Sequence, residues 1–131
     1  MQEKDLTTAL EHWMAANWDS GSVAIECKFV VAGGKAMQFA QLKSHQARAL
    51  KLAKKKLIYK IADDSIGVKP FDMFCLVDAE AYLCIFWYTP RQIKRATLID
   101  IDVFQNYIRS ADRKSIPRED AELIAKYIID L

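Results

Sequence analysis

Residues 23–46, VAIECKFVVAGGKAMQFAQLKSHQ, hold the features around which the rest of the chain is organised. The stretch begins as a hydrophobic strand in which one residue separates Glu26 from Lys28. Because strand side chains alternate between faces, Glu26 and Lys28 point one way while Ile25 and Cys27 point the other. An acid and a base next to a core are costly, which favours a functional pair. The alternative is an ion pair at a strand end, worth about 0–1 kcal/mol if exposed.

The remaining patterns predict one α+β domain over residues 1–131, with a mixed central sheet flanked by helices. Residues 3–17 carry an apolar helical stripe from Leu6 to Met14. AYLCIFWY at 81–88 is so apolar that it predicts a central strand buried on both faces, and we place Trp87 in the core together with Tyr59. Further strands are predicted over 22–31, 57–61, 71–77 and 98–101, and helices over 43–56, over 102–109 with Asp102 as its cap, and from Pro117 onward.

The charge is distributed unevenly along the chain. The net charge is +2, yet residues 28–60 contain nine Lys or Arg and no Asp or Glu. The rest of the chain holds 10 basic and 17 acidic residues, a net charge of −7. A positive surface on an otherwise acidic molecule favours a polyanionic partner such as DNA, whereas a solvated lysine-rich helix is the simpler alternative.

Cysteine usage and hydropathy indicate where the chain works. Cys27, Cys75 and Cys84 stand in apolar runs and are expected to be reduced core residues, so a zinc site is not predicted. No apolar run reaches the length of a membrane span, and the first ten residues lack a signal-peptide pattern. We therefore expect a cytoplasmic protein without a membrane partner.

Two short motifs and the C-terminal segment resemble one family. Glu26-Cys27-Lys28, followed by His45-Gln46 in SHQARAL, resembles the E-x-K strand and HQ helix of RecU-type Holliday-junction resolvases, which belong to the PD-(D/E)XK nuclease superfamily. Residues 114–117, KSIP, resemble a segment near the end of those proteins. The likeness covers most of residues 22–118 in short patches. It implies a restriction-endonuclease-like fold and a homodimeric phage or bacterial enzyme that cleaves DNA, including branched DNA, with Mg²⁺ or Mn²⁺.

The chain departs from the family pattern at one acid. The family carries a metal-binding Asp on the strand before E-x-K, whereas the nearest upstream acid here is Asp19, in a short turn. We place the missing acid at Asp72, in KPFD, on the strand–turn–strand unit formed by 57–61 and 71–77. This is a circularly permuted order of the same elements. The alternative for Asp72 is a strand-edge aspartate that caps a backbone amide.

The resemblance implies a role for each candidate residue. Glu26, Asp72 and the backbone carbonyl of Cys27 are the expected metal ligands. Lys28 orients or helps to deprotonate the attacking water, and Gln46 binds that water or a phosphate oxygen, unless Gln46 is only a polar residue of the first helical turn. Contacts to the DNA backbone are expected from Lys43, His45, Arg48, Lys51, Lys54, Lys55 and Lys69.

Two other functions fit the same residues. A nuclease-fold module that binds DNA or protein but has lost catalysis explains the absent upstream Asp. An interaction protein with no nucleic-acid role explains the fold without using the charge pattern.

Overall fold

The computed structural model describes residues 3–30, 33–62 and 65–131. Val31, the last residue of the predicted strand 22–31, lies outside the described residues. The elements follow in chain order as α1 (Glu3–Asn17), β1 (Val23–Val30), β2 (Ala36–Gln38), a 3₁₀ turn (Phe39–Gln41), α2 (Ser44–Ala53), β3 (Lys56–Lys60), β4 (Met73–Val77), β5 (Glu80–Trp87), β6 (Arg95–Asp100), α3 (Ile101–Ser110), β7 (Ser115–Pro117), α4 (Arg118–Ile124) and β8 (Tyr127–Asp130).

The main sheet has four strands in the order β1-β5-β6-β8. β1 and β5 are parallel, with Val23 opposite Glu80, and the other neighbours are antiparallel. This mixed sheet with helices on its faces confirms the predicted α+β class. β5 is an interior strand whose residues from Ala81 to Trp87 are buried, as its continuous apolar sequence predicts.

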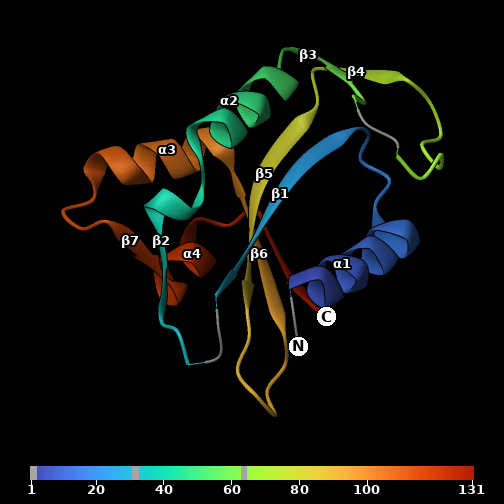
Figure 1. Cartoon of the computed structure of the whole chain (residues 1–131). Helices are drawn as coiled ribbons and strands as arrows, with labels where there is room; N and C mark the ends of the chain where they lie inside the picture. The colour runs from blue at the N-terminus through green and yellow to red at the C-terminus, as the bar shows by residue number, and fades with distance from the viewer. Residues whose placement is uncertain (1–2, 31–32, 63–64) are drawn as a thin grey trace.

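Helices cover both faces of the main sheet (Figure 1). On one face, Leu6 and Leu10 of α1 pack against Tyr82, Cys84 and Phe86 of β5, which confirms the apolar stripe of the first helix. On the other face, α2 and α3 lie over the sheet, and Leu50, Ala53, Ala81 and Ile101 form a cluster there. Full burial of one such aliphatic side chain contributes about 1.5–3 kcal/mol.

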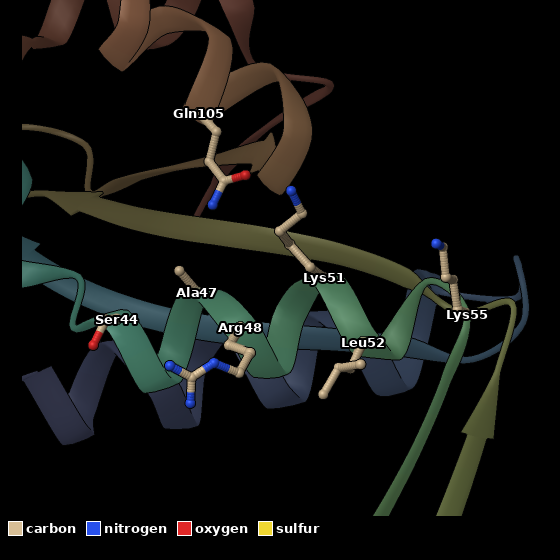
Figure 2. A pocket seen from close by; sticks show the side chains of 7 residues that line it. All are labelled: Ser44, Ala47, Arg48, Lys51, Leu52, Lys55 and Gln105. Carbon is tan, nitrogen blue, oxygen red and sulfur yellow. The ribbon is translucent and has the colours of Figure 1, made fainter.

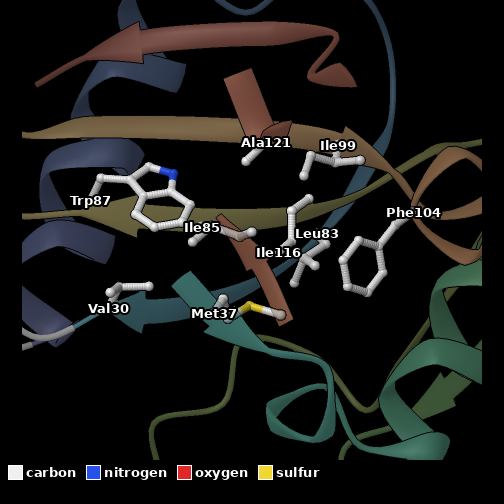
Figure 3. Packing of buried hydrophobic residues seen from close by; sticks show 9 residues of the cluster. All are labelled: Val30, Met37, Leu83, Ile85, Trp87, Ile99, Phe104, Ile116 and Ala121. Atoms are coloured by element: carbon white, nitrogen blue, oxygen red, sulfur yellow. The ribbon is translucent and has the colours of Figure 1, made fainter. Parts of the chain in front are cut away.

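A second cluster on the α3 face closes the core (Figure 3). Leu83, Ile85 and Trp87 of the sheet share this cluster with Phe104 of α3, and Met37 and Ile116 reach it from β2 and β7. β2 and β7 form a small antiparallel sheet of their own. Buried Thr97 accepts a hydrogen bond from the Trp87 indole N–H at 3.0 Å, so the one polar group that Trp87 brings into the core is satisfied.

β3 and β4 form a separate two-stranded ribbon rather than part of the main sheet. They pair antiparallel from Lys56 opposite Val77, next to α2, to Lys60 opposite Met73 at the outer end. The strand–turn–strand unit predicted over 57–61 and 71–77 is therefore present. In Figure 1 the ribbon extends away from the body of the molecule at the end of α2.

Several predicted boundaries were wrong. The helix predicted over 43–56 ends at Ala53, and the strand predicted over 98–101 begins at Arg95. Asp102 was assigned as the cap of the next helix, but Asp100 is the cap, because its side chain accepts from the backbone N–H of Asp102 at 2.8 Å. The short strands β2, β7 and β8 were not predicted.

Within the described ranges, no helix is both long enough and apolar enough to cross a membrane.

Candidate functional site

Glu26, Lys28 and Gln46 meet on the face of β1 that looks toward α2. Ala24 on this face packs with the cluster around Leu50, whereas Ile25 and Cys27 pack on the α1 side. Lys28 Nζ lies 3.3 Å from Glu26 Oε1. Gln46 Nε2 donates a hydrogen bond to the same oxygen at 3.2 Å. The structure thus brings together three residues that the E-x-K and HQ motifs single out.

The position of Gln46 is fixed by the start of α2. Gln46 is the third residue of that helix, and its side-chain oxygen accepts from the backbone N–H of Lys43 at 3.0 Å. One end of the amide therefore caps the helix while the other end holds the Glu26 carboxylate. The structure shows Gln46 as a polar residue of the first helical turn, one of the two interpretations given for it, and also places it beside Glu26.

The ion pair is only partly solvated. The Lys28 side chain is 15% exposed and the Glu26 side chain 32% exposed. An ammonium with so little contact with water depends on its partner more than a surface lysine does. The pair therefore differs from a fully solvated surface ion pair.

A pocket of about 290 Å³ opens beside this pair. Its lining comes from β1, from the first turns of α2 and from β3, and includes Glu26, His45, Gln46, Leu57 and Tyr59. One carboxylate, one amide and an imidazole thus border a space large enough for a phosphate group and water. His45 is exposed at its rim.

Asp72 lies just before β4 at the outer end of the ribbon. It is 82% exposed and pairs with Lys69 Nζ at 3.1 Å. Its backbone oxygen accepts from the N–H of Ile61 at 2.8 Å, which continues the ladder by one step. By strand alternation Asp72 shares the ribbon face of Phe74 and Leu76, the same face from which Tyr59 borders the Glu26 pocket.

The metal ligands implied by the resemblance are therefore in different places. Glu26 faces the pocket, whereas the Asp72 carboxylate is engaged by Lys69 on the ribbon. The Cys27 side chain packs on the α1 face. Its backbone carbonyl, the expected metal ligand, belongs to β1. Within residues 3–30, 33–62 and 65–131, no group of three or more His, Cys, Asp or Glu side chains is placed to hold a metal ion.

The basic residues of α2 border a groove of about 540 Å³ (Figure 2). Arg48, Lys51 and Lys55 line it together with Leu52, and Gln105 reaches toward it from α3. These three basic residues are exposed. Lys43 is also exposed and lies at the start of the same helix. The residues of α2 that line the Glu26 pocket, His45, Gln46, Ala49 and Leu50, lie on a different face of the helix from those that line the groove.

Lys54 is placed differently from its neighbours in the sequence. Its ammonium donates to Asp100 at 2.9 and 3.1 Å and to Asp102 at 2.7 Å. Desolvation lowers the pKa of Lys54, but the hydrogen bonds to Asp102 and Asp100 outweigh this and leave the pKa above its ordinary value. The hydrogen bond from Lys54 holds the pKa of Asp102 below its usual value. Lys54 thus ties α2 to the start of α3, and two carboxylates offset its charge.

Tyr59 is the site residue that the sequence analysis missed. It was assigned to the core, but its side chain is exposed, borders the Glu26 pocket and stacks on Phe74 with ring centroids 5.5 Å apart. Lysines at both ends of β3, in KLIYK, are the signal of an exposed strand. Trp87, assigned to the core in the same way, is buried.

Comparison with known proteins assigns the chain to no family, because no family model, no curated protein and no solved structure matches it.

Proposed function

We propose that this protein is a metal-dependent endonuclease that binds DNA along α2 and hydrolyses a phosphodiester in the pocket beside Glu26. One observation carries the proposal: Glu26 and Gln46 line an open pocket, and the Lys28 ammonium lies 3.3 Å from Glu26 Oε1. That pocket adjoins a helix from a segment of 33 residues without an acid. A carboxylate and an amide at one pocket, with an ammonium beside the carboxylate, are groups that phosphodiester hydrolysis uses.

Glu26 is the proposed ligand of Mg²⁺ or Mn²⁺. Bound there, the ion supplies Lewis-acid polarisation of the phosphate and a water of lowered pKa. Mg²⁺ keeps several waters and is commonly held by one or two carboxylates together with substrate phosphate oxygens. A single partly exposed carboxylate on a pocket wall fits that pattern. Asp72 remains the candidate for a second ligand, and it would have to leave Lys69 to serve.

Lys28 and Gln46 act on the charge and on the water. The Lys28 ammonium, 3.3 Å from Glu26 Oε1, stabilises negative charge that develops on the phosphate, in a place where little water competes. Gln46 holds the Glu26 carboxylate with one of its two amide hydrogens. We assign the second amide hydrogen to the attacking water.

DNA binding rests on the exposed basic residues of the groove. Arg48, Lys51 and Lys55 can contact successive phosphates without reading sequence, and His45 and Lys43 continue the contact toward the pocket. Lys54 is left out of this set because Asp100 and Asp102 hold it at 2.9 and 2.7 Å, whereas Lys51 lies 3.9 Å from Asp102 and is more exposed. The family resemblance adds a homodimer, which presents one site to each of two DNA strands.

Cleavage of supercoiled plasmid, linear duplex and four-way junctions in Mg²⁺, in Mn²⁺ and in EDTA tests the proposal. We expect metal-dependent nicking that is lost in Glu26→Gln and Lys28→Met and is reduced in Gln46→Ala. Glu11→Gln, which changes an exposed acid on α1, is the matched control and should cleave normally. Cleavage that survives in both Glu26→Gln and Lys28→Met would contradict the assignment.

A second candidate function is DNA binding without cleavage. The specific observation in its favour is that Asp72 pairs with Lys69 instead of joining Glu26. Each phosphate contact removed should reduce the slope of log affinity against log salt by about 1. Arg48→Ala and Lys55→Ala should therefore flatten the salt dependence, while Lys126→Ala, an exposed lysine before β8, should not. Salt-dependent binding without cleavage by the unaltered protein would favour this second function.

A further inference from the structure

The ribbon and its connecting turn concentrate the exposed apolar side chains of the molecule. Of the fourteen large exposed hydrophobic residues among those the structure describes, eight lie between positions 58 and 77. Scattered exposed hydrophobic residues are normal, but a contiguous group marks an interaction surface. The eight residues are Ile58, Tyr59, Ile66, Val68, Phe71, Met73, Phe74 and Val77.

The two faces of the ribbon differ. Leu57 and Leu76 are opposite each other on the inner face and pack toward α2. Ile58 is opposite Cys75 on the outer face, where Met73 and Val77 flank Cys75 along β4. Ile58 is 60% exposed and Met73 and Val77 are each 57% exposed. Cys75 is exposed as well, so the prediction that all three cysteines are core residues was wrong for Cys75.

The ribbon is also incomplete as a sheet. It has two strands only, so among the described residues each strand has an edge without a neighbour. An isolated two-stranded ribbon is marginally stable in water, and free edges and apolar faces are normally covered. Here α2 contacts the inner face through Leu57 and Leu76, and the outer face extends away from the body (Figure 1).

We propose that the outer face of the β3–β4 ribbon binds the same face of a second copy of this chain. The outer-face residues Ile58, Met73, Cys75 and Val77, with Phe71 beside them, present on the order of 500 Å² of apolar surface, at about 100 Å² for each side chain. The stems of Lys56 and Lys60 and the apolar residues of the turn extend this area toward the roughly 800 Å² per partner of a stable interface. With these additions the patch approaches the size of a stable dimer interface.

The chemistry of this face favours a second copy over other partners. Its aliphatic side chains offer no hydrogen bonds to bases or phosphates, which disfavours nucleic acid. Its apolar row runs along β4, while both of its lysines, Lys56 and Lys60, are on β3. A two-fold axis near Cys75 places Met73 of one copy against Val77 of the other and lets the lysines extend to the rim.

Sedimentation equilibrium with the full chain tests the inference. We expect a dimer of the 15.0 kDa chain at about 100 μM. Cys75→Glu places two carboxylates near the axis and should raise the dissociation constant on the order of 100-fold. Leu123→Glu is the matched control, because Leu123 is 82% exposed on α4, outside the ribbon, and its substitution should leave the dimer intact.

The reactivity of Cys75 is a second measurement that needs no variant. In the unaltered protein a maleimide should modify Cys75 quickly at low protein concentration and more slowly as the dimer forms. A monomer at every concentration, or a dimer that Cys75→Glu leaves unchanged while Cys75 stays reactive, would overturn the proposal. The inference deepens the homodimer of the proposed function, and a monomer at every concentration would remove both. Because the readouts are mass and thiol reactivity, the proposed cleavage at Glu26 is tested separately and can stand if this interface fails.

Discussion

Exchanging Lys28 for methionine separates a chemical role of the Glu26–Lys28 pair from a structural one. Lys28→Met keeps most of the side-chain volume and removes an ammonium that is only 15% exposed. The Glu26 carboxylate left behind is 32% exposed and still accepts from Gln46 at 3.2 Å. The desolvation cost of the ammonium therefore disappears along with its attraction to Glu26, and we expect the free energy of unfolding to change by about 1 kcal/mol or less, in either direction.

Glu26→Ala should behave differently, although it breaks the same pair. It leaves the poorly solvated Lys28 without its carboxylate and removes the acceptor of the Gln46 amide, which costs about 1–3 kcal/mol. Glu26→Gln keeps an oxygen acceptor and should cost less than Glu26→Ala. Urea unfolding followed by circular dichroism near neutral pH measures all three variants, and about 1 kcal/mol corresponds to a shift of about 3–5 °C in Tm for a chain of this size.

The combination of stability and activity decides the matter. If the Lys28→Met variant is as stable as the unaltered protein but does not cleave DNA, Lys28 serves catalysis and does not stabilise the fold. If Lys28→Met instead destabilises the protein by about 2 kcal/mol or more, as much as Glu26→Ala, the pair is a structural brace and the catalytic reasoning is refuted.

Two further predictions follow from the core and from the contact between α2 and α3. Thr97→Val removes the acceptor of the buried Trp87 indole N–H and should cost about 1–3 kcal/mol in urea unfolding, whereas a cost near zero would mean that the indole finds another partner. Because Lys54 lowers the pKa of Asp102, the stabilisation from this pair should be complete above the unfolded pKa of about 3.9 and be lost as the pH falls through the lower folded value. Asp102→Asn should make unfolding stability less dependent on pH in that acidic range, and an unchanged dependence would contradict the assignment.

The long, strongly patterned elements were predictable from the sequence. The apolar stripe of α1 and the continuous apolar run of β5 each indicate which of their own side chains are buried, without reference to other parts of the chain. The short strands were not predictable, because three or four residues, as in β2 and β7, carry too little periodicity. The cap at Asp100 was missed because Asp100 and Asp102 are both good capping residues, and only the end of β6 decides between them.

The candidate site was predictable in part. E-x-K alternation and the helical position of Gln46 place three side chains near one another, and the structure brings them into contact. Tyr59 was assigned to the core because the sequence of an apolar strand does not reveal whether it joins a large sheet or an exposed ribbon. Lys54 is 46 positions from Asp100 and 48 positions from Asp102 in the sequence. No local pattern indicates that these residues form ion pairs.

The parallel pairing of β1 with β5 also has a kinetic consequence. Val23 meets Glu80, a partner 57 residues later, and both α2 and the ribbon lie in the segment between them. Contacts of such separation close late, because the entropy of a long loop must be lost before the pairing is gained. We therefore expect β1, which carries Glu26 and Lys28, to pair with β5 late in refolding, and the pocket beside Glu26 to form after the more local contacts.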